Sequence, residues 1–209
     1  MLNNIEFDLW ADGYDKTVGI SDEENTYPFA GYKKVLGFIF QAIMRAENAA
    51  VLDIGFGTGT LTTKLYERGC SIYGQDFSSR MIALASEKMP NAHLYQGDFS
   101  KGLVEPLRNF RYDYIVATYS LHHLTDAQKN DFLLDLRNYL KESGKIIIGD
   151  VAFETRKASR PPVAHLSSAS ADFCRFYNFK AIKIPENSRF PGFSYICSIC
   201  SVFGKSDGI

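Results

Sequence analysis

Short apolar runs rich in β-branched residues alternate with segments of helical period between residues 49 and 153. Such alternation is typical of βαβ units, which build a parallel sheet covered by helices. The apolar runs predict strands at residues 50–54, 71–75, 92–95, 112–117 and 145–153. The segments before and between them predict helices at residues 32–47, 60–68, 79–89 and 126–141. We therefore expect an α/β fold.

The helix predicted at residues 126–141 has the strongest pattern, because its apolar side chains repeat on one stripe. Gly144 follows Ser143 where a helix C-terminus commonly takes glycine, so we expect the helix to end there. The helix at residues 32–47 is apolar on most of its circumference, which predicts that it packs against the sheet.

Both ends of the chain differ from this centre. Residues 1–28 mix aromatic and acidic side chains without a clear period, which predicts an irregular arm or lid. After residue 154 the pattern predicts a helix at 169–177 and a hairpin of two strands, 179–184 and 194–203, that closes one sheet edge. No repeat or low-complexity linker separates these parts. We expect a single domain over residues 1–209, made of the arm at 1–28, a core at 29–154, and the helix and hairpin at 155–209.

Composition supports a soluble globular protein, because 45% of the 209 residues are hydrophobic and 22% are charged. The longest apolar run, residues 35–44, is shorter than the roughly 18 residues that cross a bilayer. The start of the chain lacks the pattern of a secretory signal. We therefore expect a cytoplasmic protein without a membrane partner, in which the four cysteines are free thiols.

Two classes of partner are disfavoured by the sequence. The net charge of −1 lacks the basic footprint of a general nucleic-acid binder, so we expect no nucleic-acid partner. Cys197 and Cys200 have the spacing of half a zinc site, but they fall on a predicted strand, where positions three apart face opposite sides. We expect no metal site.

Three alternating glycines follow the first predicted strand and precede a predicted helix. Glycine lets a ligand approach backbone N–H groups closely, and a helix N-terminus attracts an anion. Gly55, Gly57 and Gly59 form G-x-G-x-G, whereas the dinucleotide fingerprint is G-x-G-x-x-G. Asp53 stands two residues before the first glycine, where a pyrophosphate has no use for a carboxylate but a ligand with an ammonium group does. A nicotinamide-dependent oxidoreductase is therefore disfavoured.

Two further acids follow the next two strands, and parallel strands bring such positions to one edge of a sheet. Asp76 lies 21 residues after the first glycine, a separation that lets a carboxylate accept hydrogen bonds from both hydroxyls of a ribose. Asp98 follows the third strand, where it can accept a hydrogen bond from an adenine amino group, with Phe77 and Phe99 flanking the ring. The sequence thus predicts an adenosine site at this edge, and the ribose acid by itself fits NAD as well as an adenosine that carries an amino acid.

With these motifs the sequence resembles the class I S-adenosylmethionine-dependent methyltransferases. The likeness covers about residues 30–153, and its motifs fall at residues 51–59, 73–77, 96–99, 112–124 and 140–148. It implies a Rossmann-like sheet of seven mostly parallel strands in the order 3-2-1-4-5-7-6, with helices on both faces. It also implies S-adenosylmethionine as the cofactor.

A closer likeness is to small, single-domain bacterial methyltransferases, through W-A-D-G-Y-D at residues 10–15 and S-L-H-H-L at residues 120–124. In such enzymes the N-terminal tyrosine, here Tyr14, usually folds over the cofactor. The residues that we expect to bind the cofactor are Tyr14, Asp53, Gly55, Phe56, Gly57, Thr58, Gly59, Asp76, Phe77, Met81, Gly97, Asp98, Phe99 and Thr118.

Methyl transfer from a sulfonium is an in-line displacement, so the protein mainly aligns the acceptor and excludes water. A general base helps when the acceptor must lose a proton, and Tyr119, His122 and His123 lie where the methyl group should point. The histidine pair can equally be a packing and capping feature.

The favoured acceptor is a small molecule, because residues 117–120 read A-T-Y-S in place of the Asn/Asp-Pro-Pro-Tyr/Phe common in enzymes that methylate nitrogens of macromolecules. The alternatives are a methyltransferase of nucleic acid or protein and a cofactor-binding protein without catalysis. A homodimer stays open.

Overall fold

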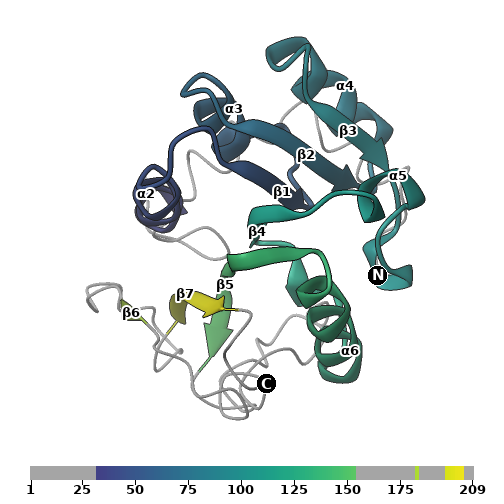
Figure 1. The fold of residues 1–209 in the computed structure, drawn as a ribbon. Helices are drawn as coiled ribbons and strands as arrows, with labels where there is room; N and C mark the ends of the chain where they lie inside the picture. Colours follow the sequence, from purple (N-terminus) through teal and green to yellow (C-terminus); the bar gives the residue numbers. More distant parts are fainter. Residues whose placement is uncertain (1–31, 154–181, 184–195, 205–209) are drawn as a thin grey trace.

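A central sheet runs through the part of the chain that the computed structural model describes, residues 32–153, 182–183 and 196–204 (Figure 1). Its parallel strands pair in the order β3-β2-β1-β4-β5. They are β1 (Ala50–Ile54), β2 (Ser71–Asp76), β3 (His93–Gln96), β4 (Tyr112–Thr118) and β5 (Leu140–Phe153). The predicted α/β fold with a parallel sheet is confirmed.

Two more strands extend the sheet beyond β5. The strand β7 (Ile196–Gly204) pairs antiparallel with β5, and the short β6 (Ile182–Lys183) pairs antiparallel with β7. The sheet order with them is β3-β2-β1-β4-β5-β7-β6. The arm at residues 1–28 and the helix predicted at 169–177 lie outside the described residues.

Helices pack on both faces of the sheet because neighbouring strand residues point to opposite sides. Val51 belongs to a core beneath α2 (Tyr32–Ile43), α3 (Thr60–Tyr66) and α4 (Ser79–Lys88). Leu52, the next residue, belongs to the second core, beneath α5 (Glu105–Arg108) and α6 (Asp126–Arg137). Both cores are built from aliphatic and aromatic side chains, so the sheet is covered on each side.

The boundary between α6 and β5 differs from the prediction. The helix ends at Arg137, and Leu140 already pairs with Tyr112 as the first residue of β5. Gly144 lies inside that strand, next to a register shift in the β4–β5 pairing. A Cβ at Gly144 would lie 2.8 Å from the carbonyl oxygen of Tyr112. Glycine is therefore needed at this position because the backbone is crowded at an irregularity of the strand, and it does not end the helix as we expected.

Three short elements at the strand ends were not predicted, namely the 3₁₀ turns η1 (Phe99–Lys101) and η2 (Leu121–His123) and the helix α5. Each has too few residues to show a hydrophobic period. The helix α2 is also shorter than expected and ends at Ile43.

Of the cysteines, Cys70 is a buried free thiol, and the side chains of the other three lie outside the described part. No helix among the described residues has the length and apolar character to span a bilayer.

Candidate functional site

The glycine loop connects β1 to α3 in a backbone conformation that only glycine adopts easily. Gly55, Gly57 and Gly59 have φ values of 71°, 57° and 78°. A Cβ at Gly55 would lie 2.6 Å from the Cβ of Ser120, so the loop passes directly against the end of β4. The spacing in the sequence thus predicted a real turn, and the structure adds a steric reason for its first glycine.

Ser120 joins the ends of β1 and β4. Its buried hydroxyl donates a hydrogen bond of 2.7 Å to the carbonyl oxygen of Ile54, the last residue before the loop. This role could not be predicted from the sequence, because the two partners are 66 residues apart. The one available signal was a small polar residue directly after the fourth strand.

Asp76 ends β2 and holds two backbone segments together. One carboxylate oxygen accepts a 2.8 Å hydrogen bond from the N–H of Gly57, and the other accepts a 2.9 Å bond from the N–H of Ser78. Each oxygen can accept a second hydrogen bond. Asp76 therefore ties the glycine loop to the turn before α4.

Asp53 lies beside Asp76 in a very different setting. Its side chain is buried, and Oδ1 has no hydrogen-bond partner within the described part of the chain. Burial, together with the charge of Asp76, raises the pKa of Asp53 from 3.8 to about 8. A cation beside this carboxyl group would stabilise its ionised form. The ammonium group expected from the sequence would supply one, so the residues fit that ligand.

Asp98, after β3, caps the η1 turn. Its Oδ1 accepts hydrogen bonds from the N–H and the hydroxyl of Ser100, at 3.0 and 2.6 Å, and Oδ2 pairs with Lys101 at 3.2 Å. Partial burial raises the pKa of Asp98, but these contacts outweigh it and hold the pKa below its ordinary value. The carboxylate is thus ionised, and it stabilises the η1 turn through its contacts with Ser100 and Lys101.

The segment after β3 is anchored by Gln75, which the sequence analysis did not single out. Its buried amide donates a 3.1 Å hydrogen bond to the carbonyl of Gly102 and accepts a 2.8 Å bond from the N–H of Val104. At Gly97, a Cβ would lie 2.5 Å from Val104. This close packing sets the position of Asp98.

Besides Asp53 and Asp76, four more of the expected cofactor residues have buried side chains. The Phe56 ring packs over Gly74, and Phe99 stacks on Phe132 with ring centroids 6.1 Å apart. Thr58 and Met81 are also buried, while Phe77 is partly exposed. Main-chain groups are therefore what Phe56 can offer a ligand.

The end of β4 is strained at Tyr119. Its φ of 51° is unusual for a bulky residue, and its N–H donates a 2.7 Å hydrogen bond to the carbonyl of Gly149. The ring packs in the core against Tyr32, with centroids 5.0 Å apart. Thr118, just before it, is half-buried. This turn redirects the chain into η2.

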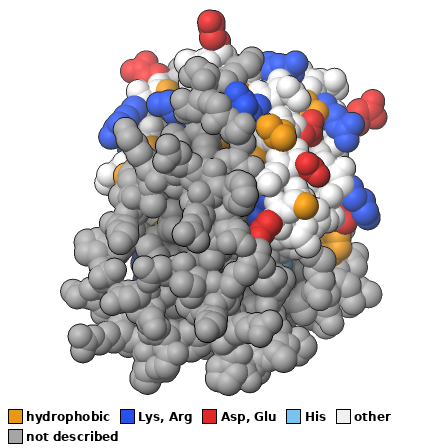
Figure 2. All heavy atoms as spheres, turned by 90° about the horizontal axis from the view of Figure 1, so that it is seen from below, with side chains coloured by type: hydrophobic (Ala, Val, Ile, Leu, Met, Phe, Trp, Pro, Cys, Tyr) orange, Lys and Arg blue, Asp and Glu red, His pale blue; other side chains and the backbone are white. Residues whose placement is uncertain are grey.

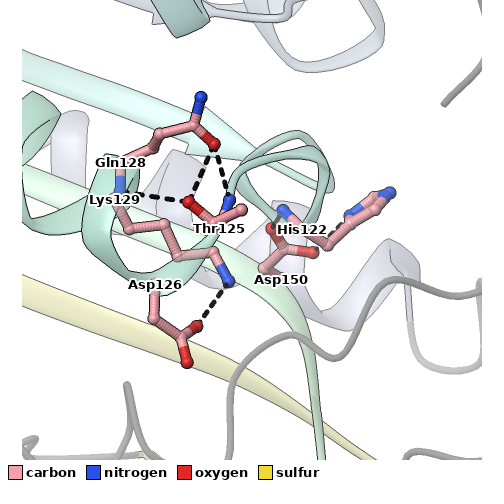
Figure 3. Close-up of polar contacts among 6 residues, drawn as sticks. All are labelled: His122, Thr125, Asp126, Gln128, Lys129 and Asp150. Atoms are coloured by element: carbon pink, nitrogen blue, oxygen red, sulfur yellow. Dashed lines mark hydrogen bonds and ion pairs between the residues drawn. The ribbon is translucent and has the colours of Figure 1, made fainter.

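The histidine pair in η2 meets a carboxylate from β5. His122 Nδ1 lies 2.9 Å from Asp150 Oδ1, and the backbone N–H of His122 donates a 3.0 Å bond to Oδ2 (Figure 3). The His123 ring lies 4.2 Å from that of His122, and burial with the neighbouring His122 lowers the pKa of His123 to about 4. Asp150 was not among the residues predicted from the sequence, because it lies 28 residues from His122 within a predicted strand.

The helix α6 starts directly after this pair, with a capping box. Thr125 Oγ1 accepts a hydrogen bond from the N–H of Gln128, and the Gln128 side chain accepts one from the N–H of Thr125 (Figure 3). The cap fixes where the η2 turn ends.

The structure therefore brings the glycine loop together with Asp53, Asp76 and Ser120 at one edge of the sheet. Tyr14, the remaining predicted site residue, lies outside the described residues.

Comparisons with known proteins agree with this arrangement. A methyltransferase domain family matches residues 51–144. Among solved structures, a TehB-like SAM-dependent methyltransferase from Corynebacterium glutamicum matches with a TM-score of 0.59 at 19% identity, over 91% of this chain and 96% of that one. DhpI in complex with SAH matches with a TM-score of 0.54 at 19% identity, over 95% and 77%. At identities this low, the two matches show a shared fold and nothing more.

Curated relatives are closer in sequence. An uncharacterized methyltransferase of Anoxybacillus flavithermus is 37% identical over 158 residues, which are 76% of this chain and 71% of the relative. YrrT of Bacillus subtilis, also an uncharacterized methyltransferase, is 37% identical over 153 residues, 73% of this chain and 68% of its own. The chain therefore belongs to this family of methyltransferases and is itself a methyltransferase.

Proposed function

We propose that this methyltransferase transfers a methyl group from S-adenosylmethionine to a small-molecule acceptor. The observation that carries the proposal is the pair of adjacent carboxylates at the glycine loop. Asp53 is buried and its Oδ1 has no hydrogen-bond partner among the described residues, while Asp76 is anchored by two backbone N–H groups. One site thus holds a buried carboxyl group that a cation would stabilise and a second carboxylate that is anchored at the glycine loop.

The residues divide the ligand between them. Asp53 would take the ammonium group and the N–H groups of the glycine loop the carboxylate of the methionine portion, while Asp76 would accept from the ribose. Asp98 and Phe77 would contact the adenine, and we propose that the arm with Tyr14 covers the ligand. When bound, S-adenosylmethionine supplies an already activated methyl group.

The chain's own contribution to the reaction is alignment and exclusion of water. We propose that residues 1–209 act as one domain in this task, with Tyr119, His122 and His123 as the candidate bases. The turn at Tyr119 and the η2 turn lie at the same strand ends as the glycine loop, because Ser120 bonds to Ile54.

Charge and sequence favour a small acceptor over a nucleic acid. The net charge is −1, and Figure 2 shows acidic and basic side chains of the described residues intermixed on one face. Residues 117–120 also lack the Asn/Asp-Pro-Pro-Tyr/Phe motif.

A thermal-shift titration of the full chain tests the cofactor. S-adenosylmethionine and its demethylated product should each raise the melting temperature, because a ligand at about 100 times its dissociation constant adds roughly 2.7 kcal/mol to the free energy of unfolding. NADH should have no effect. A shift with NADH alone would contradict the proposal.

The acceptor class is tested with methyl-labelled S-adenosylmethionine. Label should enter metabolites of a cell extract and not its tRNA or protein fractions. Label found only in a macromolecule would establish the alternative function.

A further inference from the structure

Asp150 holds His122 at two points. One oxygen accepts the backbone N–H of His122 at 3.0 Å, and the other lies 2.9 Å from Nδ1 of the ring. The first contact fixes the residue relative to β5, and the second fixes the ring. Neither carboxyl nor ring is fully exposed, with side-chain exposures of 13% and 26%, so water competes only in part.

The chemistry of the contact decides which ring nitrogen carries the proton. An ionised carboxylate only accepts hydrogen bonds, so Nδ1 must donate. A neutral imidazole then has its lone pair on Nε2. The same arrangement, with a carboxylate behind one nitrogen, orients histidines and raises their basicity in metal and hydrolase sites.

The neighbouring ring does not disturb this arrangement. His123 lies 4.2 Å from His122, and its lowered pKa of about 4 keeps it neutral near pH 7. His122 therefore has no second positive charge beside it from that residue, and its ring turns away from the Thr125 cap of α6 (Figure 3).

The pair also lies on the side of the sheet where the cofactor site lies. Gly149, next to Asp150, accepts the N–H of Tyr119, and Ser120 bonds to Ile54 at the start of the glycine loop. His122 follows Ser120 by two residues. In open α/β sheets, this edge at the carboxyl ends of the strands is where ligands react.

We propose that Asp150 is a positioning residue that holds His122 in the Nδ1–H tautomer, so that Nε2 removes a proton from an acceptor hydroxyl or thiol. The inference rests on the proposed function. As the acceptor oxygen or sulfur forms its bond to the methyl carbon, the bond from that carbon to the cofactor sulfur breaks and its electron pair stays on that sulfur. The acceptor proton goes to Nε2 and then to water.

The tautomer is measured on the ligand-free full chain labelled with ¹⁵N-histidine. Long-range ¹H–¹⁵N spectra separate the two tautomers, and His122→Gln identifies the signals of His122. We expect the neutral His122 ring of the wild type to carry its proton on Nδ1 and none on Nε2. Asp150→Asn should move His122 toward the Nε2–H form, because the amide can donate to Nδ1.

Asp113→Asn is the matched control, because Asp113 is also a carboxylate with a backbone N–H and a side-chain partner, Ala50 and Lys141, but it lies at the opposite end of β4. It should leave the His122 signals unchanged. Binding of S-adenosylhomocysteine, measured by calorimetry, should be retained in both Asn variants and shows that they are folded. If either variant is unfolded, Asp150→Glu should retain the wild-type tautomer. An Nε2–H tautomer in the wild type, or one that does not respond to Asp150→Asn, overturns the proposal.

Turnover tests the acceptor class. Labelled products from the metabolite extract should carry the methyl group on oxygen or sulfur, and their yield should fall about 10²-fold to 10⁴-fold in His122→Gln. Methyl esters of carboxylates or quaternary amines as the only products overturn the class, because neither acceptor needs a base. Failure of the wild type to bind S-adenosylhomocysteine would overturn the proposed function instead. The two outcomes can be distinguished, because the tautomer is measured on the ligand-free chain and does not depend on cofactor binding.

Discussion

Asp53 and Asp76 show how two identical side chains acquire different properties from their surroundings. Asp76 accepts two backbone N–H groups, which stabilise its charge. Asp53 is buried beside that charge, so its pKa rises to about 8. The glycine loop thus has two carboxyl groups beside it, one held by backbone N–H groups and one that keeps its proton until a cation arrives.

Ligand binding should release this proton. The ligand-free protein keeps Asp53 protonated between its ordinary pKa of 3.8 and about 8, whereas an ammonium group beside it favours the ionised form. Affinity for S-adenosylhomocysteine should therefore rise from about pH 6 toward about pH 8, by at most about tenfold per pH unit. Calorimetry in buffers of different ionisation heat measures the release, which Asp53→Asn should abolish. A pH-independent affinity without proton release would place the ammonium group elsewhere.

The raised pKa of Asp53 also makes the stability of the folded protein depend on pH. Between 3.8 and about 8 the folded state binds the proton more tightly than the unfolded chain, so the free energy of unfolding falls as pH rises through this window.

Asp76→Asn should weaken binding of S-adenosylhomocysteine by about 1 to 3 kcal/mol, because a ribose hydroxyl loses its charged acceptor. Asparagine is the milder replacement, since it keeps an acceptor oxygen for one of the N–H groups of Gly57 and Ser78, whereas alanine would leave both without their partner. The measurement is calorimetric titration near neutral pH. Asp113→Asn, remote from the loop, should keep wild-type affinity. Equal affinities for all three proteins would remove Asp76 from the site.

At the scale of elements, glycine is required in the loop but not in α2. Gly55 combines a φ of 71° with a Cβ position only 2.6 Å from Ser120, whereas Gly37 in α2 has no atom within 4 Å of its Cβ position. The first glycine is required by conformation and by contact, and the second by neither.

Gly55→Ala should lower the free energy of unfolding by about 1 to 3 kcal/mol through backbone strain and overpacking. Gly37→Ala should raise it by about 0.5 to 1 kcal/mol, because alanine favours the helix. Urea denaturation measures both. Gly69→Ala separates the two causes in Gly55, since Gly69 has a φ of 87° but its nearest neighbour is 3.5 Å away. If Gly69→Ala lowers the free energy of unfolding as much as Gly55→Ala does, the contact with Ser120 contributes nothing to the effect at Gly55.

At the scale of the whole molecule, the two cores share one sheet. Adjacent residues of β1 and of β5 enter opposite cores, and α2 packs directly on β5 through Val35 at Gly149. Loss of the sheet would expose both cores together.

The full chain should therefore unfold in one cooperative transition, as expected for a single domain. S-adenosylhomocysteine at about 100 times its dissociation constant should move that whole transition by about 5 to 11 °C, given about 2 to 4 °C per kcal/mol at this size. Differential scanning calorimetry is the measurement. Two unfolding transitions, only one of which is shifted by the ligand, would show that the chain contains two domains and not one.

The sequence by itself determined the alternation of strands and helices, the bounds of β1 and the positions of the glycines and acids at the strand ends. These features are local, because hydrophobic period and glycine spacing act within about one element. Where a local signal had two meanings, as at Gly144, the sequence pointed to the wrong one.

The tertiary structure alone decided which distant groups meet. Ser120 with Ile54, His122 with Asp150 and Gln75 with Val104 are separated by 66, 28 and 29 residues. Their meeting depends on strand order and register, which set what lies opposite each strand end. The directions of the Phe56 and Phe99 rings likewise follow from packing in the two cores. The carboxylates could thus be identified from the chain, but their charge states and partners arise only when the sheet brings them together.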